Sequence, residues 1–531
     1  MTSNTENSPA GIRRSGTKRI LATAAATAAG LVIFTACDKG HDDSGETPEP
    51  EIVRPEELVT DTYTAYPSGE NACVDSYLTI TFRSEPAIGT SGTIRITDED
   101  GQTVDVIEMA DIAALAEGKP AMTESSIFTT AMDAVGSSAA GRYRIVYGNP
   151  VSVDGNTMTI RPHCDRLEYG RTYSVAIDAD AVSAEGFSGI SGDEWTFSVM
   201  GKPSGAEVSV SARECDFMTV QGAINYASSL GQSTAVTILV EDGVYEEQLY
   251  IRNKNNLTIR GESREGTVIR FDNCNDYIPG TGSGRTSVPE PGDQVGTIGG
   301  RSVILVENSD MLRFEDISLE NTHGHGSQAE VIYFNCDSGR IVARNCCFSG
   351  EQDTIELKGW GSFRDCLIRG DVDFIWGYAK AALFESCEIR SCMNDNGGYI
   401  VQARCQAGDR GFVFSGCSLT AESGVEDGSI YLARSGGDAS CYDNVTYVNC
   451  SMGPHISPAG WRSSPTPNPS AASAENGWKE YRSTDPDGVL LDVTSRYGGS
   501  MQLQESDWRS LYADAQAVFA SCPHGFAWAE E

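Results

Sequence analysis

Basic residues are scarce in this chain of 531 residues, which has 39 lysines and arginines against 75 aspartates and glutamates. The formal net charge is −36, and no long Lys/Arg run follows the N-terminal segment. Backbone phosphates require a basic patch, so this composition argues against nucleic acid as a partner. An acidic substrate is compatible with it only if local cations in the cleft offset the field of the whole protein.

Closely spaced cysteine pairs are also lacking. The 16 cysteines include no CxxC…CxxC arrangement, which argues against structural zinc. Without Cys37, which lies in the N-terminal segment, fifteen are left. An odd number of cysteines cannot all pair in an oxidising compartment.

The N-terminal apolar run, ILATAAATAAGLVIF at 20–34, is too short for a typical membrane-spanning helix. Arg13, Arg14, Lys18 and Arg19 precede it, and it ends in FTAC. Residues 1–36 therefore resemble a lipoprotein signal peptide, which implies cleavage before Cys37 and lipidation of its thiol. An ordinary secretory signal with an incidental cysteine is the alternative, and Phe34 departs from the leucine usual in such signals.

Residues 37–54 are acidic and proline-rich, a composition typical of a flexible tether. This tether and the lipid anchor together predict a lipoprotein of the cell envelope that is held at the outer membrane, and we expect it to be a monomer. The sequence leaves open whether the protein faces the periplasm or the cell exterior.

Residues 55–201 contain short runs of alternating apolar and polar residues, bounded by Gly, Asp or Asn. Examples are SYLTITF (76–82), GTIRITDEDG (92–101), RYRIVYG (142–148), NTMTIRP (156–162), TYSVAID (172–178) and EWTFSV (194–199). Seven or so such strands predict an antiparallel β-sandwich. The segment resembles bacterial immunoglobulin-like (Ig-like) domains of surface enzymes. It carries no catalytic constellation, and we expect a spacer or carbohydrate-binding role.

Residues 205–531 are organised by a repeat. It occurs as FEDISLEN (314–321), ARNCCFSG (343–350), FRDCLIRG (363–370), FESCEIRS (384–391), FSGCSLTA (414–421) and YVNCSMGP (447–454). The spacings are 29, 20, 21, 30 and 33 residues, and no long helical pattern separates the units. The chain is therefore predicted to be all-β, with a right-handed parallel β-helix following the sandwich.

The β-helix prediction also indicates where the repeated cysteines and one amphipathic stretch lie in the fold. Cys346, Cys366, Cys387, Cys417 and Cys450 form an internal ladder. We interpret them as small packed side chains rather than as disulfides or metal ligands. The apolar spacing of MTVQGAINYAS (218–228) predicts a short helix that caps the open end of the solenoid.

An offset of 20 residues superimposes two coils and brings two acids together. Cys346 then falls on Cys366, and Asp353 of GEQDT falls on Asp373 of GDVDFIWG. Neighbouring strands are about 4.8 Å apart, so the two carboxyl groups would lie roughly 5 Å from each other. Like charges that close cannot both ionise cheaply, which suits a nucleophile beside a general acid. The alternative is that both are turn residues bound to backbone.

Polar residues elsewhere fit the same chemistry. The amides of Gln352 and Gln328 could donate to an oxyanion, and Arg434 could hold one carboxylate ionised. His323 and His325 form an HxH pair that could bind metal, but no carboxylate or cysteine ligand adjoins it in sequence. We therefore predict no metal site.

The ordered motifs resemble the pectin methylesterase (pectinesterase) family over residues 213–531. They are DFMTVQGAI (216–224), DGVYEE (242–247), NLTIRGE (256–262), NTHGHGSQA (321–329), GEQDT (350–354), GDVDFIWG (370–377), YLAR (431–434), PAGW (458–461) and GWKEYRST (477–484). The resemblance implies a parallel β-helix that demethylates galacturonate esters in pectin, with neither metal nor organic cofactor.

By this resemblance Asp373 is the nucleophile that attacks the ester carbonyl, and Gln328 and Gln352 stabilise the oxyanion. Asp353 protonates the departing methanol and then activates the water that hydrolyses the acyl-enzyme. Arg434 keeps Asp373 charged. These roles agree with the 20-residue register.

The chain departs from the family at the sugar subsite. It has LARSG where the family usually has LGRPW, so Gly436 replaces a tryptophan, and Trp376 replaces a phenylalanine of FIFG. We expect Trp376, with Phe374 beside it, to contact the substrate, because sugar faces stack on aromatic rings. The alternative is that the change indicates a different sugar decoration or a weakened site.

Two other functions are compatible with the sequence. One is another β-helix enzyme of pectin breakdown, a pectate lyase or a polygalacturonase. The other is a non-catalytic glycan-binding lipoprotein on a decayed esterase scaffold. The departure from the family pattern at LARSG is the reason for considering it.

Overall fold

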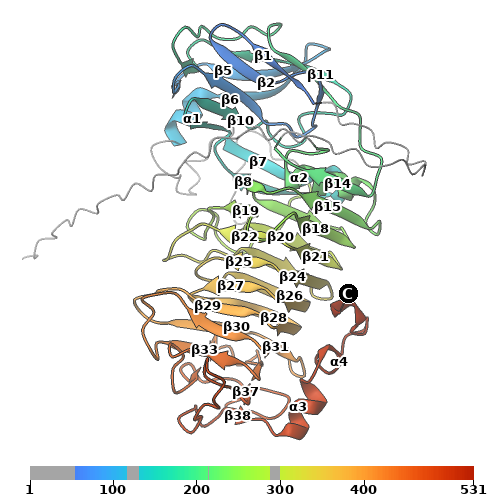
Figure 1. Ribbon diagram of the computed structural model, residues 1–531. Helices are drawn as coiled ribbons and strands as arrows, with labels where there is room; N and C mark the ends of the chain where they lie inside the picture. The colour runs from blue at the N-terminus through green and yellow to red at the C-terminus, as the bar shows by residue number, and fades with distance from the viewer. Residues whose placement is uncertain (1–53, 116–130, 213–214, 288–298, 531) are drawn as a thin grey trace, which may run out of the picture. The chain divides into compact units, whose positions relative to one another are not determined.

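The computed structural model describes residues 54–115, 131–212, 215–287 and 299–530, and its regular structure consists mainly of strands (Figure 1). The predicted signal peptide, Cys37 and all of the tether except Arg54 lie outside the described residues. Within these ranges no helix is both long and apolar enough to cross a membrane.

The first part of the described chain is a nine-stranded sheet in the order β6-β5-β11-β13-β2-β3-β10-β9, with β1 paired to β2. All of its pairings are antiparallel except the one between β13 and β2. Its strands are β1 (Glu56–Val59), β2 (Tyr63–Ala72), β3 (Leu78–Phe82), β5 (Thr93–Asp98), β6 (Thr103–Glu108), β9 (Val151–Asp154), β10 (Thr157–Ile160), β11 (Thr172–Ile177) and β13 (Thr196–Val199).

A small antiparallel pair and a helix complete this part: β4 (Ala87–Ile88) with β12 (Val182–Ser183), and α1 (Met109–Leu115). The hairpin of β7 (Met132–Ser137) and β8 (Arg142–Tyr147), whose second strand was predicted to belong to the sandwich, packs instead on the second part of the chain, where Arg144 donates to the carbonyls of Leu249 and Val303. One face of each alternating strand is buried around Trp195 and Phe197. The assignment of this part as an immunoglobulin-like domain, with limits at 55 and 201, stays a prediction.

The second part is a parallel β-helix, as predicted, and its strands stack coil on coil in Figure 1. Its larger, 17-stranded sheet contains β14 (Glu207–Val210), β15 (Val236–Val240), β17 (Leu249–Arg252), β18 (Leu257–Gly261), β20 (Ile304–Glu307), β21 (Leu312–Glu315), β23 (Ile332–Asn335), β24 (Arg340–Arg344), β26 (Ile355–Arg364), β28 (Val372–Glu385), β30 (Gly398–Ala403), β31 (Gly411–Ser415), β33 (Ile430–Arg434), β34 (Val445–Val448), β36 (Trp461–Arg462), β37 (Trp478–Tyr481) and β38 (Met501–Gln502).

The eight-stranded sheet contains β16 (Gly243–Glu246), β19 (Thr267–Phe271), β22 (Ser318–Asn321), β25 (Cys347–Ser349), β27 (Leu367–Gly370), β29 (Glu388–Ser391), β32 (Ser418–Ala421) and β35 (Ser451–Met452). The predicted offset of 20 is confirmed, because Phe348 pairs with Ile368 and Ile355 with Ile375.

A left-handed turn residue precedes the repeated cysteine of each unit and explains the repeat. Positive φ occurs at Asn345 (49°), Asp365 (55°), Ser386 (55°), Gly416 (62°) and Asn449 (52°). Glycine, asparagine and aspartate adopt this conformation more readily than other residues. The turn directs the chain from the larger sheet into the smaller one, so it keeps successive coils in register.

Ladders of like residues fill the interior. Phe363, Phe384, Phe414 and Tyr447 stack with ring centroids 4.6, 4.8 and 4.5 Å apart. The five cysteines of the predicted ladder are buried free thiols, which confirms their interpretation as packed side chains.

Helices cover one end and one outer face of the coils. The predicted capping helix is present as α2 (Val220–Ser229), with Thr219 accepting a hydrogen bond from the amide of Gly222. Near the C-terminus, α3 (Glu505–Leu511) and α4 (Ala515–Val518) belong to an apolar cluster with side chains that point outward from the larger sheet, among them Trp360 and Leu383.

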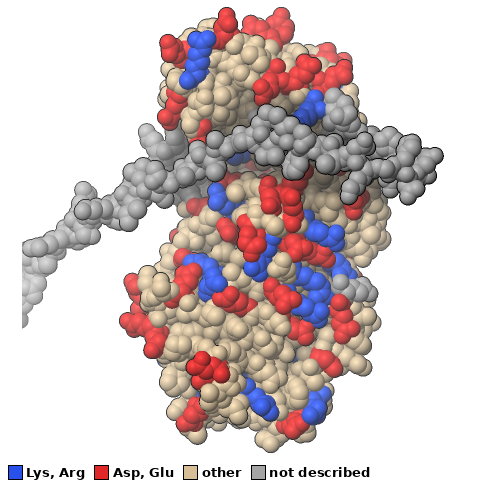
Figure 2. Space-filling view, viewed as in Figure 1, with Lys and Arg blue, Asp and Glu red and all other residues tan. Residues whose placement is uncertain are grey.

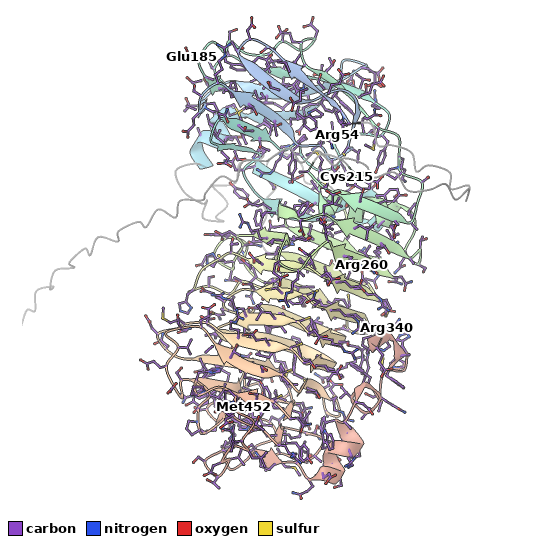
Figure 3. The ribbon with its side chains drawn as sticks, viewed as in Figure 1. Arg54, Glu185, Cys215, Arg260, Arg340 and Met452 are labelled. Carbon is purple, nitrogen blue, oxygen red and sulfur yellow. The ribbon has the colours of Figure 1, made fainter. Side chains whose placement is uncertain are left out.

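Acidic and basic side chains are interspersed on the visible face of the β-helix, mainly over its upper half (Figure 2). Arg260 on β18 contacts Glu315 on β21 at 2.6 Å, and Arg340 on β24 contacts Asp310 (both arginines are labelled in Figure 3). Coil-to-coil pairing thus balances part of the acidic surface.

Candidate active site

The corners that follow the strands of the smaller sheet gather most of the predicted catalytic residues. Gln328 lies between β22 and β23, Gln352 and Asp353 between β25 and β26, and Asp373 at the start of β28. Asp353 and Asp373 both have positive φ, 67° and 50°, and the amide of Asp353 donates to the carbonyl of Val372 at 3.0 Å. The register therefore places the two acids on adjacent coils.

Asp373 is held by donors from two later coils. Arg434 on β33 brings Nε to 2.8 Å and 3.0 Å from the two carboxylate oxygens, and its Nη2 also contacts Oδ2. Gln402 on β30 donates to Oδ2 at 2.7 Å. The Arg434 guanidinium itself lies over the ring of Tyr399, 4.5 Å from its centroid. Charge-assisted contacts of this kind stabilise the ionised carboxylate.

Asp353 has weaker cationic support. Gln328 Nε2 donates to its Oδ2 at 3.0 Å, and Arg301 Nη2 lies 3.2 Å from the same oxygen. Arg301, however, binds Glu330 through both Nε and Nη2, so its charge is shared. The side chain of Asp353 is 4% exposed, and a lone ion there would be poorly solvated.

The electrostatics separate the two acids. Burial raises the pKa of Asp353 well above its usual value, Glu330 and Asp373 raise it further, and Arg301 opposes them. The pKa of Asp373 is also raised by burial, but less, because Arg434 and Gln402 oppose the effect of burial. The geometry thus favours a protonated Asp353 beside an ionised Asp373.

The two predicted oxyanion donors differ in their contacts. Gln328 is tied at both ends, with its Oε1 accepting from Arg301 at 2.6 Å. Gln352 is half-buried, and its backbone carbonyl accepts from the amide of Ala329 at 3.1 Å. Within the described part of the chain no hydrogen bond holds the side-chain amide of Gln352. That amide is available to a substrate oxygen.

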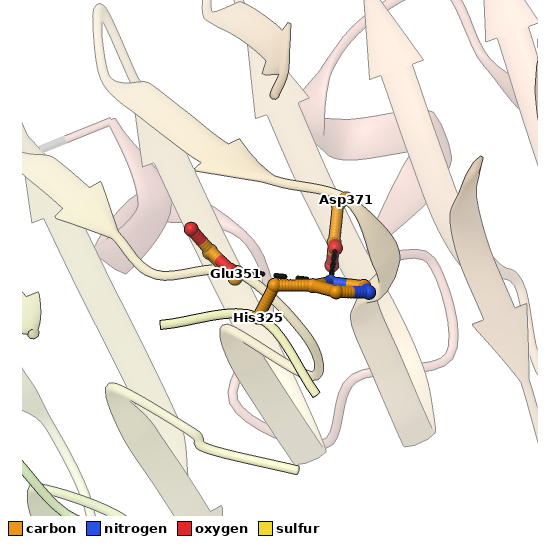
Figure 4. A group of neighbouring side chains, drawn as sticks. All are labelled: His325, Glu351 and Asp371. Atoms are coloured by element: carbon orange, nitrogen blue, oxygen red, sulfur yellow. Dashed lines mark hydrogen bonds and ion pairs between the residues drawn. The ribbon is translucent and has the colours of Figure 1, made fainter. Parts of the chain in front are cut away.

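The histidines of the HxH pair have carboxylate neighbours that their sequence context did not indicate. His323 Nδ1 lies 3.0 Å from Asp272, and His325 Nδ1 lies 2.6 Å from Asp371 and 4.0 Å from Glu351 (Figure 4). Zinc ligands at about 2.0–2.1 Å from the metal stand roughly 3.3 Å from each other. His325 and Asp371 are closer than that and bond directly, so we assign no metal ligand here.

The two residues predicted to contact the substrate, Phe374 and Trp376, differ in burial. Phe374 is fully buried in the β-helix core, so its assignment to the substrate is wrong and its ring serves packing. The left-handed backbone of Asp373 interrupts strand alternation, and Phe374 and Ile375 both face the core. Trp376 is 6% exposed and lies under Arg404, whose guanidinium carbon is 4.9 Å from the ring centroid. Beside Gly436, the side chains of Gln402 and Arg404 take up the nearby space.

Four polar residues near the two acids were missed by sequence reasoning: Arg301, Glu330, Gln402 and Glu356. Alternation along β30 could have indicated Gln402, which sits in YIVQAR between buried residues. Arg301 and Glu330 adjoin loops of irregular length. In such loops the coil-to-coil register does not predict which residues lie beside one another.

Comparisons with a family model, with related sequences and with solved structures all identify the same family. A family model described as Pectinesterase matches residues 207–486. Pectinesterase 31 of Arabidopsis thaliana is 33% identical over 250 residues, 46% of this chain and 73% of that relative. The probable pectinesterase/pectinesterase inhibitor 64 of the same plant is 28% identical over 58% of this chain, but the match spans only half of that longer relative. A solved pectin methylesterase from Erwinia chrysanthemi is 24% identical, with a TM-score of 0.46 over 58% of this chain and 96% of that structure.

Proposed function

Because this chain belongs to the pectinesterase family, we propose that it is a carboxylic ester hydrolase that removes methyl groups from the galacturonate units of pectin. The observation that carries the proposal is the unequal support of two adjacent acids. Asp373 has an arginine and a glutamine of its own, whereas Asp353 shares its arginine with Glu330.

The first half-reaction follows from that inequality. The ionised carboxylate of Asp373 attacks the ester carbonyl carbon, and the amides of Gln352 and Gln328 stabilise the oxyanion that forms. The bond to the methoxy oxygen then breaks, and Asp353 gives its proton to that oxygen. Methanol leaves, and the galacturonate acyl group is joined to Asp373 as an anhydride.

The second half-reaction restores both acids. Asp353, now ionised, takes a proton from a water molecule as that water attacks the acyl carbon. The bond to Asp373 breaks, its carboxylate returns to Arg434, and the demethylated galacturonate leaves as a carboxylic acid that ionises in water. No step needs a metal or an organic cofactor.

The deciding experiment measures methanol released from highly methylated pectin by the wild type and by Asp373→Ala. The proposal expects release by the wild type and none above background by the variant. Uronide oligomers in place of methanol would identify a lyase or a polygalacturonase. Pectin binding without any methanol would instead favour a non-catalytic glycan-binding protein, the reading motivated by Gly436.

Three finer assignments complete the proposal. Cys37 carries a lipid that attaches the protein to the outer membrane through the acidic tether, and residues 55–201 form an Ig-like spacer. The signal-like composition of residues 1–36 and the antiparallel strands after Glu56 support them. Trp376 is proposed to contact the substrate, supported by its place three residues after Asp373.

A further inference from the structure

A buried charge network stands behind Asp353. Arg301 is 7% exposed at its side chain and Glu330 is fully buried. The guanidinium approaches Glu330 with Nε 2.9 Å from both carboxylate oxygens and Nη2 2.7 Å from Oε1. Its contact with Asp353 is a single one at 3.2 Å. The cation is thus oriented toward Glu330 and only touches the catalytic acid.

A third carboxyl group, that of Glu356 on β26, belongs to the same network. Its residue is 2% exposed, and its Oε2 is a buried oxygen with no hydrogen-bond partner in the described part of the chain. Burial and the neighbouring Glu330 raise the pKa of Glu356 to about 9. Glu356 is therefore neutral near pH 7 and does not compete for Arg301.

The remaining charged groups that face Asp353 are already engaged. Asp373 lies on the next coil, and its negative charge is bound by Arg434. Lys358, which acts on Glu356 from the same strand, lies 3.7 Å from Asp337. Gln328 contributes no charge. The protonation of Asp353 therefore depends on how Arg301 divides its charge between Asp353 and Glu330.

We propose that Glu330 keeps the catalytic acid protonated by holding the charge of Arg301 away from Asp353. Glu330 touches no reacting atom, so it is a positioning residue that acts through Arg301 and through its own charge. The inference rests on the proposed esterase function, since it assigns the proton that leaves with methanol. It also explains why a fully buried glutamate follows directly on the Gln328 corner, where an apolar side chain would pack without cost.

Glu330→Gln tests the inference because it keeps the shape of the side chain and removes its charge. Arg301 would then pair with Asp353 and lower its pKa by roughly one unit or more. A general acid must be protonated, so activity falls as the pH rises through its pKa. The alkaline limb of kcat/KM for methanol release should therefore move to lower pH by that amount.

The double variant Arg301→Gln/Glu330→Gln removes both charges and should return the alkaline limb to within a few tenths of a unit of the wild type. Arg301→Gln alone leaves the anion of Glu330 facing Asp353, so its limb should move upward. Opposite shifts from the two partners are not expected of residues that only maintain packing.

Glu480→Gln is a matched control. Glu480 and Arg496 form another buried ion pair, with side-chain exposures of 0% and 7% and a 2.9 Å contact, on β37 and the loop after it. Its loss should lower stability in a similar way and leave the alkaline limb in place. The inference is overturned if Glu330→Gln releases methanol with the limb of the wild type and of Glu480→Gln.

An infrared titration separates this outcome from a failure of the proposed function. The carboxylic-acid band that disappears in Asp353→Asn reports the protonation of Asp353 without turnover. In the wild type this band should persist to higher pH than in Glu330→Gln, even if no methanol is released. Equal titration of the band in both proteins would refute the role of Glu330. If Glu330→Gln does not fold, Arg301→Gln provides the test, because its band should persist to higher pH than that of the wild type and an unshifted band would refute the role.

Discussion

Arg434 contacts both carboxylate oxygens of Asp373 although the two residues are 61 positions apart in the chain. The contact exists because β28, β30 and β33 stack in order, so that Arg434 lies two coils beyond Asp373. A carboxylate bound in this way is ionised and oriented before substrate arrives. The corresponding contact of Asp353 is single and shared, and this difference supports the assignment of nucleophile and acid.

Asp353→Asn should abolish turnover with little loss of folding. The amide is close in size to the carboxylic acid, but it cannot donate a proton to methoxide or take one from water. Methanol release should fall by at least about 100-fold, with an unchanged circular dichroism spectrum. Full activity in this variant would remove Asp353 from the mechanism.

Gln402→Leu should reduce kcat/KM by about 10- to 100-fold, since a hydrogen bond to a charged group is worth about 1.5–3 kcal/mol. Losing this donor also raises the pKa of Asp373, so the acidic limb of the pH profile should move to higher pH. Gln402→Glu should be worse, because it adds an anion beside the nucleophile. An unshifted acidic limb in Gln402→Leu would show that Arg434 alone sets the ionisation of Asp373.

Trp376→Ala should raise KM for pectin several-fold with a smaller change in kcat, if the ring supports the sugar as proposed. Trp376→Phe retains an aromatic face and provides the comparison. The ring is 6% exposed beneath Arg404, so Arg404→Met tests whether the guanidinium covers the subsite. A loss of thermal stability in Trp376→Ala with no change in KM would assign the ring to packing alone.

Glu356→Gln should stabilise the protein increasingly as the pH rises from 5 to 8. The folded-state pKa of about 9 lies above the ordinary value of 4.5, so folding favours the protonated form. The wild type therefore loses stability as the pH rises through this window, by at most about 1.4 kcal/mol per unit, and the variant does not. Denaturant midpoints at pH 5 and pH 8 measure the difference. A gap of the same size at both values would mean that Glu356 does not titrate in this range.

Cys37→Ala should release the protein from membranes into the soluble fraction, because the proposed lipid would attach to that thiol. Fractionation of cells that express the full chain, followed by detection of the β-helix, measures this. Undiminished attachment to membranes would count against lipidation at Cys37.

Periodicity was enough to predict the parts of the site that repeat. The turn residues Asn345 and Asp365 carry a local conformational preference, and one offset then aligned Asp353 with Asp373. The network of Arg301 and Glu330 lay beyond that reasoning, since both residues adjoin loops whose lengths vary. Phe374 was misassigned because the left-handed turn at Asp373 interrupts strand alternation, so that Phe374 and Ile375 both face the core.

The length of one coil determines where this fold can accept foreign sequence. The coils that follow the site are longer than 20 residues by up to 13, and the additions form rim loops such as those at 392–397 and 422–429. The coil from Asp353 to Asp373 contains no such addition. One extra residue within its strands would move the following side chains to the opposite face unless a bulge absorbed it, as the bulge after Gly359 in the pairing of β26 and β28 does for the next coil. Libraries intended to change substrate range should therefore diversify and lengthen the rim loops and leave this coil at its present length.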